Sequence, residues 1–163
     1  MTDWLYAEAG VRRLYGLYAD ALWRKDAAAF GACFSQDAVW KIAGRQLRGR
    51  LEIVAGFETF TASAHKVAMF TGSPVISLNG DEVTGRTQVT EYSKLKDGAA
   101  IRTLGIYYDR FVEADGRWLF QWHHFDMSYY GPPDFSAPYF DCADYGPPPG
   151  FPGANAPTTI RKP

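Results

Sequence analysis

The sequence predicts an α+β domain in which three N-terminal helices wrap a curved antiparallel sheet. Apolar residues recur at helical spacing only before about residue 63, and the chain then turns to β-texture with Asn-Gly and Asp-Gly turns. About 130 residues precede the proline-rich C-terminal segment, and this number is typical of one domain. Helices that cover one face of a strongly curved sheet form a cone with an internal pocket.

The helical half contains three predicted segments. Residues 2–25 carry an apolar stripe at helical spacing, with Thr2 as the expected N-cap. Asp26 can cap a short helix over residues 27–33. A strand over residues 38–42 and a turn over residues 44–50 lead to the third helix, residues 51–63.

The second half reads as a meander of long strands. We expect them at residues 66–78, 82–94, 100–112 and 117–127. The connections around Gly80, Gly98 and Gly116 are hairpin turns, because Asn, Asp and Gly accept positive φ with little strain. Sequential hairpins imply antiparallel neighbours.

The chain divides at about residue 130 into the cone domain, residues 1–130, and a tail, residues 131–163. Nine of the ten prolines lie at or after Pro132, yet the tail also holds Phe135, Tyr139, Phe140 and Phe151. A freely flexible tail is normally poor in aromatic residues. We therefore expect a partly anchored tail, over the pocket mouth or across a neighbouring subunit, with disorder confined to residues 153–163.

Composition and charge exclude several functional classes. The net charge is −1 from 17 basic and 18 acidic residues, which disfavours nucleic-acid or membrane-surface partners. No apolar run is long enough to cross a bilayer, and the acidic N-terminal residues are unlike a secretory signal. A cytoplasmic protein is expected. The aromatic content of 16% predicts an aromatic-lined site.

Several short motifs occur in an order typical of one family. They are Leu17–Asp26 (LYADALWRKD), Phe34–Trp40 (FSQDAVW), Gly44–Arg50 (GRQLRGR), Leu78–Asp81 (LNGD), Gly105–Phe111 (GIYYDRF) and Asp115–Trp118 (DGRW). With these, the chain over about residues 5–127 resembles the SnoaL-like branch of the nuclear-transport-factor-2-like (cystatin-like) superfamily. That resemblance implies the cone fold, but the superfamily hosts cyclases, dehydratases, dehydrochlorinases, isomerases and binding proteins.

The resemblance also bears on candidate site residues. Scytalone dehydratase and hexachlorocyclohexane dehydrochlorinase relatives use a His–Asp pair in the cavity, and the matching positions here hold Met69 and Trp23, so the chain lacks their pair. Tyr18 and Tyr107 resemble positions that point into the cavity, where a phenol can donate to a substrate oxygen. Packing in the core with a satisfied hydroxyl is the alternative for both.

His123 is the favoured proton-transfer residue. Alternation on the last strand places one histidine on each face, so one of them faces the pocket in either case. One face holds Leu119, Gln121, His123 and Phe125, and the other holds Trp118, Phe120, Trp122 and His124. His65 lies where the third helix meets the sheet, and a role in the site competes with a capping role.

The remaining candidates would form the walls of the pocket. Trp23, Trp40, Met69 and Phe125 would make an apolar, polarizable surface for flat rings, although aromatic residues at such spacing often serve only the core. Three polar residues of the meander could point inward, but a solvated outer face is favoured for them: Gln88, Glu91 and Arg102.

These observations favour a cofactor-independent lyase that acts on an aromatic or polycyclic small molecule. Elimination, dehydration or deformylation of a lignin-derived diaryl compound would suit a dry pocket with tyrosines and a histidine. A polyketide cyclase or isomerase and a non-catalytic binder of an apolar molecule are the alternatives. Three His and two Cys without ligand spacing, and no Gly-rich loop, predict that no metal or organic cofactor is needed. The family resemblance favours a homotrimer, with a dimer as the alternative.

Overall fold

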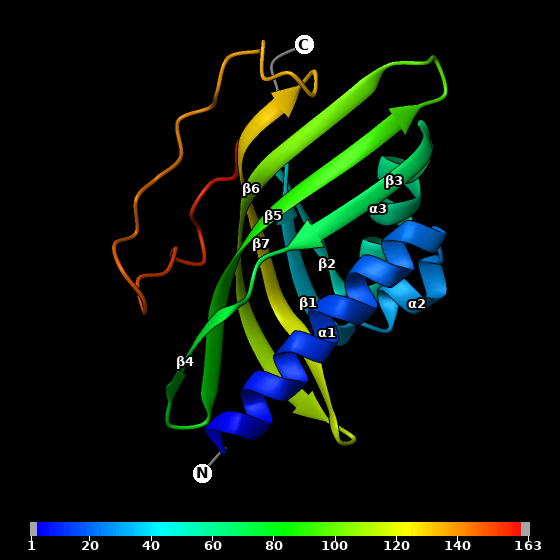
Figure 1. Ribbon diagram of the computed structural model, residues 1–163. Coiled ribbons are helices and arrows are strands. Elements are labelled where there is room, and N and C mark those ends of the chain that lie inside the picture. Colours follow the sequence, from blue (N-terminus) through cyan, green and yellow to red (C-terminus); the bar gives the residue numbers. More distant parts are fainter. Residues whose placement is uncertain (1–2, 161–163) are drawn as a thin grey trace.

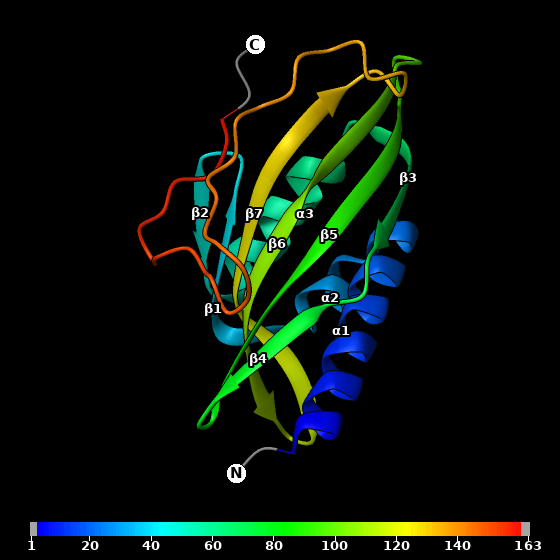
Figure 2. The same ribbon diagram turned by 60° about the vertical axis from the view of Figure 1, so that its left-hand side comes forward.

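The computed structural model describes residues 3–160, which form three helices and seven strands. The helices precede most of the sheet in the chain, and Figure 1 shows them packed against one face of it. Residues 132–160 run over the opposite face (Figure 2). The elements are α1 (Trp4–Arg24), α2 (Ala27–Gly31), β1 (Phe34–Ile42), β2 (Arg45–Arg48), α3 (Gly49–Thr61), β3 (Ala64–Thr71), β4 (Val75–Asn79), β5 (Glu82–Leu95), β6 (Ala100–Ala114) and β7 (Arg117–Gly131).

The predicted α+β fold is confirmed, with one change in topology. The sheet has the order β2-β1-β7-β6-β5-β3, and β4 pairs with the other end of β5. Every pair is antiparallel except β1 with β7, which run parallel. Parallel neighbours need a long crossover connection, and α3 with strands β2 to β6 provides it here. The curved sheet does not close into a barrel, and the helices pack against its concave face (Figure 1).

The helix ends follow the expected capping chemistry with a shift at the first one. The Asp26 carboxylate accepts a hydrogen bond from the Ala29 amide, as predicted for an N-cap. Thr2 lies outside the described residues, and the cap of α1 is Asp3, whose side chain accepts from the Tyr6 amide. The helix therefore begins at Trp4.

Two predicted segments have a different structure. The arginine-rich stretch before α3 forms the short strand β2 against β1, and not merely a turn. The single strand predicted over residues 66–78 is two strands, β3 and β4, because the Gly72-Ser73-Pro74 segment interrupts pairing. Proline has no amide hydrogen to donate to a sheet ladder, which explains the break.

A bulge in β7 decides which side chains face the helices. Phe111 pairs with Phe120, but Arg110 pairs with Trp122, so Gln121 is an extra residue on β7. Strict alternation therefore fails, and Phe120 shares the inner face with His123, their ring centroids 4.5 Å apart. The prediction that Phe120 lies opposite His123 is wrong for this reason.

The tail lies against its own sheet. Phe151 packs on Trp122, and the Lys41 ammonium donates to the backbone carbonyls of Ala154 and Ala156. The Thr159 hydroxyl donates to the carbonyl of Met127, so contacts continue into residues 153–160. Phe151 is therefore anchored on the outer face of this chain's own sheet. Within the described chain, no helix is long and apolar enough to cross a lipid bilayer.

Candidate functional site

A cavity of about 180 Å³ opens between the inner face of the sheet and the helices. Its walls are mostly aromatic and aliphatic, which is typical of a site for a small organic molecule. Aromatic side chains from α1, α2, α3 and the sheet supply most of the surface: Tyr18, Phe30, Trp40, Phe57, Phe60, Tyr107, Phe125 and Tyr130. Thr61, Ser63, Glu91, Ser93 and Thr103 add polar groups.

A chain of buried hydrogen bonds ends at this cavity. The Tyr15 hydroxyl donates to Asp109 Oδ2, and Asp109 Oδ1 is bonded to His123 Nδ1. On the other side of the imidazole, His123 Nε2 lies 3.2 Å from the Tyr18 hydroxyl, which lines the cavity. With Asp109 as a carboxylate, the imidazole carries its proton on Nδ1 and accepts the Tyr18 proton at Nε2.

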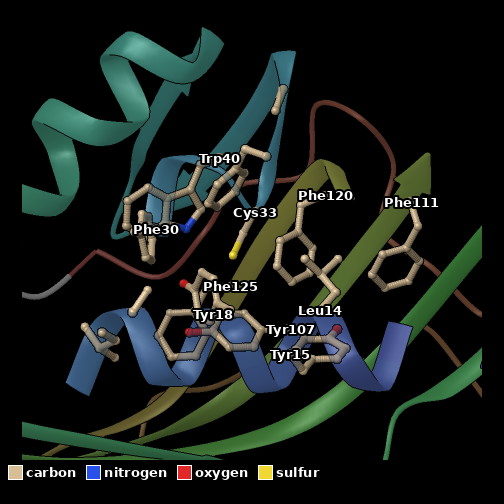
Figure 3. Close-up of a cluster of buried hydrophobic side chains, with 14 of the residues drawn as sticks. Leu14, Tyr15, Tyr18, Phe30, Cys33, Trp40, Tyr107, Phe111, Phe120 and Phe125 are labelled. Carbon is tan, nitrogen blue, oxygen red and sulfur yellow. The ribbon is translucent and has the colours of Figure 1, made fainter. Parts of the chain in front are cut away.

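His123 itself does not line the cavity. It is 0% exposed and lies between the rings of Phe120 and Tyr107, whose centroids are 4.5 and 4.3 Å from its own. Figure 3 shows Tyr18 from α1 beside Tyr107 from the sheet. Both phenols line the cavity, and the hydrogen-bonded path from the imidazole to a ligand runs through Tyr18.

The local sequence explains how the four groups meet. Tyr15 and Tyr18 are three residues apart on α1, so they project from the same helix face toward β6 and β7. Asp109 and His123 are direct cross-strand partners, and the extra residue Gln121 brings them into register. Helix periodicity and one bulge thus align two phenols with a His–Asp pair.

Burial keeps the phenols protonated. Desolvation raises the pKa of Tyr18 well above its usual value, and the neighbouring Tyr107, Glu91 and Asp109 raise it further. The pKa of Tyr15 is raised by burial and then by the charge of Asp109. Burial is also the main cause of the raised pKa of Tyr107. At neutral pH, all three therefore act as hydrogen-bond donors.

Local packing also sets the cavity wall. Gly105 on β6 lies under the ring of Phe125, and an added Cβ there would come within 2.3 Å of that ring. The missing side chain lets Phe125 lie flat enough to line the cavity. The Tyr107 hydroxyl donates weakly to the Met69 sulfur at 3.6 Å, a bond it can exchange for a ligand acceptor.

The neighbouring histidine belongs to a second pair on the outer face. His124 Nε2 is 2.8 Å from Asp126 Oδ1, and the His124 ring stacks on Trp122 beneath the tail residue Phe151. His124 is also fully buried. The backbone of β7 separates His124 from the cavity. His123 is therefore the histidine that faces the helices.

The other predicted site residues divide into three groups. Tyr18, Tyr107, Trp40 and Phe125 line the cavity together. Met69 is buried behind Tyr107 and is not part of the lining. Trp23 is 63% exposed, because it lies on the solvent side of α1, so the prediction of a wall residue is wrong. His65 points outward from β3, between the inward Ala64 and Val67, and is exposed.

Three residues of the site were missed or misplaced by sequence reasoning. Asp109 and Tyr15 did not stand out because they occur singly within apolar segments. Counting residues back from the Asp115-Gly116 turn would pair Asp109 with Trp122, and only the bulge corrects this to His123. Glu91 was favoured for the outer face, but Val89, Glu91, Ser93 and Leu95 all line the cavity. That alternation was the available signal.

The arrangement of Tyr18, His123 and Asp109 can accept, hold and return one proton beside a largely apolar cavity. Within residues 3–160, no group of three or more His, Cys, Asp or Glu side chains is placed to hold a metal ion. The cavity lining offers no loop of backbone amides of the kind that binds phosphates. A phenol that is hydrogen-bonded to a His–Asp pair can take part in acid–base chemistry on a small molecule.

Comparisons with solved structures place the fold among known proteins. A type 2 hexachlorocyclohexane dehydrochlorinase is 18% identical with a TM-score of 0.72, covering 88% of this chain and 95% of its own. A protein from Novosphingobium aromaticivorans assigned as a scytalone dehydratase is 18% identical, with a TM-score of 0.73 and coverages of 78% and 87%. Another from that organism, assigned as an aromatic ring hydroxylase, is 20% identical, with a TM-score of 0.74 and coverages of 80% and 95%.

At these identities the likeness establishes the fold alone, and the three names describe different chemistries. No curated protein sequence matches this chain. The model of the SnoaL-like domain matches residues 4–123, which include α1, the Asp109 position and His123. With the cone, the cavity and this match together, the chain belongs to the SnoaL-like domain family.

Proposed function

We propose that this protein is an acid–base lyase that eliminates water from a hydroxylated aromatic molecule without a metal or organic cofactor. The observation that carries this proposal is the hydrogen-bond chain from Tyr15 through Asp109 and His123 to Tyr18 at the cavity wall. The names of the dehydratase and dehydrochlorinase neighbours are consistent with an elimination. Only Tyr18 in this chain of groups reaches the ligand space.

The direction of the hydrogen bonds suggests how the proton moves. The Tyr18 oxygen takes a proton from a substrate carbon next to a carbonyl, while the Tyr18 hydroxyl proton passes to His123 Nε2. Asp109 stabilises the resulting imidazolium, and Tyr15 stabilises Asp109. The proton then returns through Tyr18 to the departing hydroxyl group, which leaves as water with its bonding electron pair. The substrate gains a carbon–carbon double bond, and the protein is unchanged.

Tyr107 serves as the donor to the substrate carbonyl in this scheme. Its hydroxyl donates weakly to the Met69 sulfur and also interacts with the Tyr18 hydroxyl, and its raised pKa keeps the proton in place. A phenol can thus stabilise negative charge that develops on an enolate oxygen. The dry aromatic walls strengthen that interaction, because the effective dielectric constant there is lower than in water.

The same relay permits an isomerase. If the abstracted proton returns to a different carbon, the product is a double-bond isomer or a cyclised compound, and no water leaves. A lignin-derived diaryl compound is the finer expectation for the substrate, since Trp40 and Phe125 can hold flat rings. Formaldehyde release from such a compound would use the same base.

A homotrimer is the proposed assembly. The outer face of β3 and β5 exposes Phe70 and Tyr92, whose ring centroids lie 6.2 Å apart. Burial of such a patch between subunits would remove apolar surface from water. Analytical ultracentrifugation at micromolar concentration tests this, and a pure monomer would refute it.

The activity is tested with 4-hydroxy-4-phenylbutan-2-one, a neutral aromatic β-hydroxy ketone that loses water to a conjugated ketone. We expect product absorbance to rise with wild-type protein and to rise about 10²–10³-fold more slowly with Tyr18→Phe. Hydrogen–deuterium exchange next to the carbonyl without water loss would favour the isomerase, and binding without exchange would favour the non-catalytic binder. Chelation is expected to leave the rate unchanged, and a rate lost with a chelator and restored by one metal would refute metal independence.

A further inference from the structure

One buried donor in the cavity lining has no acceptor. Trp40 lines the cavity and is 3% exposed, yet its indole Nε1 has no hydrogen-bond partner within residues 3–160. An indole N–H can only donate, and a buried donor that stays unpaired costs free energy. Most buried polar groups in proteins are satisfied. An unpaired donor in the wall of a ligand cavity therefore points to an acceptor that the ligand supplies.

The groups packed around Trp40 cannot take this proton well. Three phenylalanine rings contact the indole, with centroids 5.4–6.2 Å from that of Trp40: Phe30, Phe34 and Phe60. The face of such a ring is at best a weak acceptor. His123 is the cross-strand partner of Trp40 on β7, but both of its ring nitrogens are already bonded, to Asp109 and to Tyr18. These neighbours leave the indole donor for a molecule in the cavity.

The position of Trp40 lets one ligand reach both its indole and the phenols. Figure 3 shows Trp40 projecting from β1 with its indole nitrogen, in blue, on the side of the ring turned toward α1. The ring of Phe30 is 5.4 Å from that of Trp40 and 4.8 Å from that of Tyr18, centroid to centroid. The indole and the phenol thus share one aromatic neighbour, while they extend from different walls of the cavity. A flat ring with an oxygen at each end would satisfy both donors.

We infer that Trp40 is a specificity-determining residue whose indole N–H donates to a second oxygen of the ligand, at the other end of the aromatic ring from the oxygen that the phenols bind. The inference rests on the proposed function, and it narrows the substrate class of the same cavity to aromatic ketones with a further carbonyl or ether oxygen. An alkyl group in that place would leave the donor unpaired, which is how a buried polar group rejects an analogue.

Two matched probes test this inference by isothermal titration calorimetry: 1,4-diacetylbenzene and 4-isopropylacetophenone. Both are uncharged and carry one ketone for the phenols. In the second probe, an isopropyl group of similar shape replaces the other acetyl group and removes its acceptor. We expect wild-type protein to bind 1,4-diacetylbenzene at least about fivefold more tightly, because only this probe satisfies the indole.

A variant of Trp40 separates the hydrogen bond from the shape of the wall. Trp40→Phe keeps an aromatic ring and removes the N–H, so the preference for 1,4-diacetylbenzene should fall below about twofold. The ratio between two probes of similar shape cancels most of the effect of the smaller ring. The matched control is Trp23→Phe, the same change at a position that is 63% exposed on α1, which should keep the preference of the wild type. Circular dichroism checks that both variants are folded.

The indole signals give a readout that needs no variant. In an NMR spectrum of nitrogen-15-labelled wild-type protein, the Nε1–H signal of Trp40 should move downfield on saturation with 1,4-diacetylbenzene, because a hydrogen-bonded proton is deshielded. With 4-isopropylacetophenone it should not move downfield. The signal of the exposed Trp23 should stay in place with both probes.

Each outcome bears on the inference. Equal affinity of wild-type protein for the two probes, a preference that survives in Trp40→Phe, or a Trp40 signal that does not move downfield would overturn it, and so would failure to bind either probe. If Trp40 controls the preference but the hydroxy ketone is not converted, the proposed function fails and the specificity role stands. If the ketone is converted and the two probes bind equally, only the inference fails.

Discussion

His123 and His124 are adjacent on β7, each is fully buried, and each is bonded to an aspartate. Their surroundings nevertheless differ completely. The inner pair, His123 with Asp109, is extended by Tyr15 on one side and by Tyr18, which lines the cavity, on the other. The outer pair, His124 with Asp126, is sealed between the sheet and residues of the tail.

The comparison teaches that a His–Asp pair alone does not define a site. His124 Nδ1 and Asp126 Oδ2 have no hydrogen-bond partner in the described chain, so no hydrogen-bond chain continues from the outer pair. In the inner pair, every ring nitrogen and both carboxylate oxygens are bonded. Continuity to the cavity, provided by a single phenol, is what distinguishes the two.

The largest effect is expected from breaking the inner chain. His123→Ala and Tyr18→Phe should each lower kcat by about 10²–10³-fold, the usual contribution of a general acid–base group. The two losses should be similar, because Tyr18 is the link between the imidazole and the cavity. Steady-state kinetics with the hydroxy ketone measures both. His124→Ala, assayed per folded molecule, is the control and should stay within about threefold of the wild type.

The next effect concerns the stability of the outer face. Phe151 packs against Trp122 and Tyr108, so Phe151→Ala should lower the free energy of unfolding by about 1–3 kcal/mol while kcat is retained. Urea denaturation measures this. Leu51→Ala, at a position 84% exposed on α3, should change stability by less than about 0.5 kcal/mol. A fall in kcat of Phe151→Ala as large as that of His123→Ala would mean that the outer face takes part in the chemistry.

A smaller effect is expected for the second phenol. Tyr107→Phe removes one hydrogen-bond donor to the substrate but leaves the chain from Asp109 to Tyr18 intact, so kcat should fall about tenfold. The kinetics of this variant sharpen the comparison within the inner face. A loss equal to that of Tyr18→Phe would show that the two phenols act as one unit.

The smallest effects are expected at Trp23 and His65. Both are exposed and neither lines the cavity, so Trp23→Ala and His65→Ala should alter kcat and KM by less than about twofold. The same kinetic assay applies. An inactive His65→Ala variant that remains folded would move the site to another wall of the cavity.

Much of the fold could be predicted because its signals are local. Helix periodicity located α1, Asp26 marked the start of α2, and the turns at Gly80, Gly98 and Gly116 adopt the positive φ values that the Asn-Gly and Asp-Gly sequences favour. The parallel pairing of β1 with β7 was not predicted, because it joins segments far apart in the chain. Local patterns carry no information on such a contact.

The candidate site was only partly predictable for the same reason. The family resemblance pointed to Tyr18 and Tyr107, and residue type pointed to Trp40 and Phe125 as wall residues. Asp109 required the register between β6 and β7, which depends on one extra residue at Gln121. Trp23 was misplaced because the resemblance matched it with a cavity position. The adjacent Leu22 lines the cavity instead, and one step along a helix turns a side chain by about 100°.

The central claim is that Tyr18 connects the inner His–Asp pair to the cavity, and nitrogen NMR of the imidazole side chains tests it most directly. On addition of 2-naphthol, the Nε2 resonance of His123 should shift while the resonances of His124 stay in place. In Tyr18→Phe, most of the shift at His123 should be lost although the probe still binds. An unchanged His123 resonance at saturation, or an equal shift in Tyr18→Phe, would contradict the account.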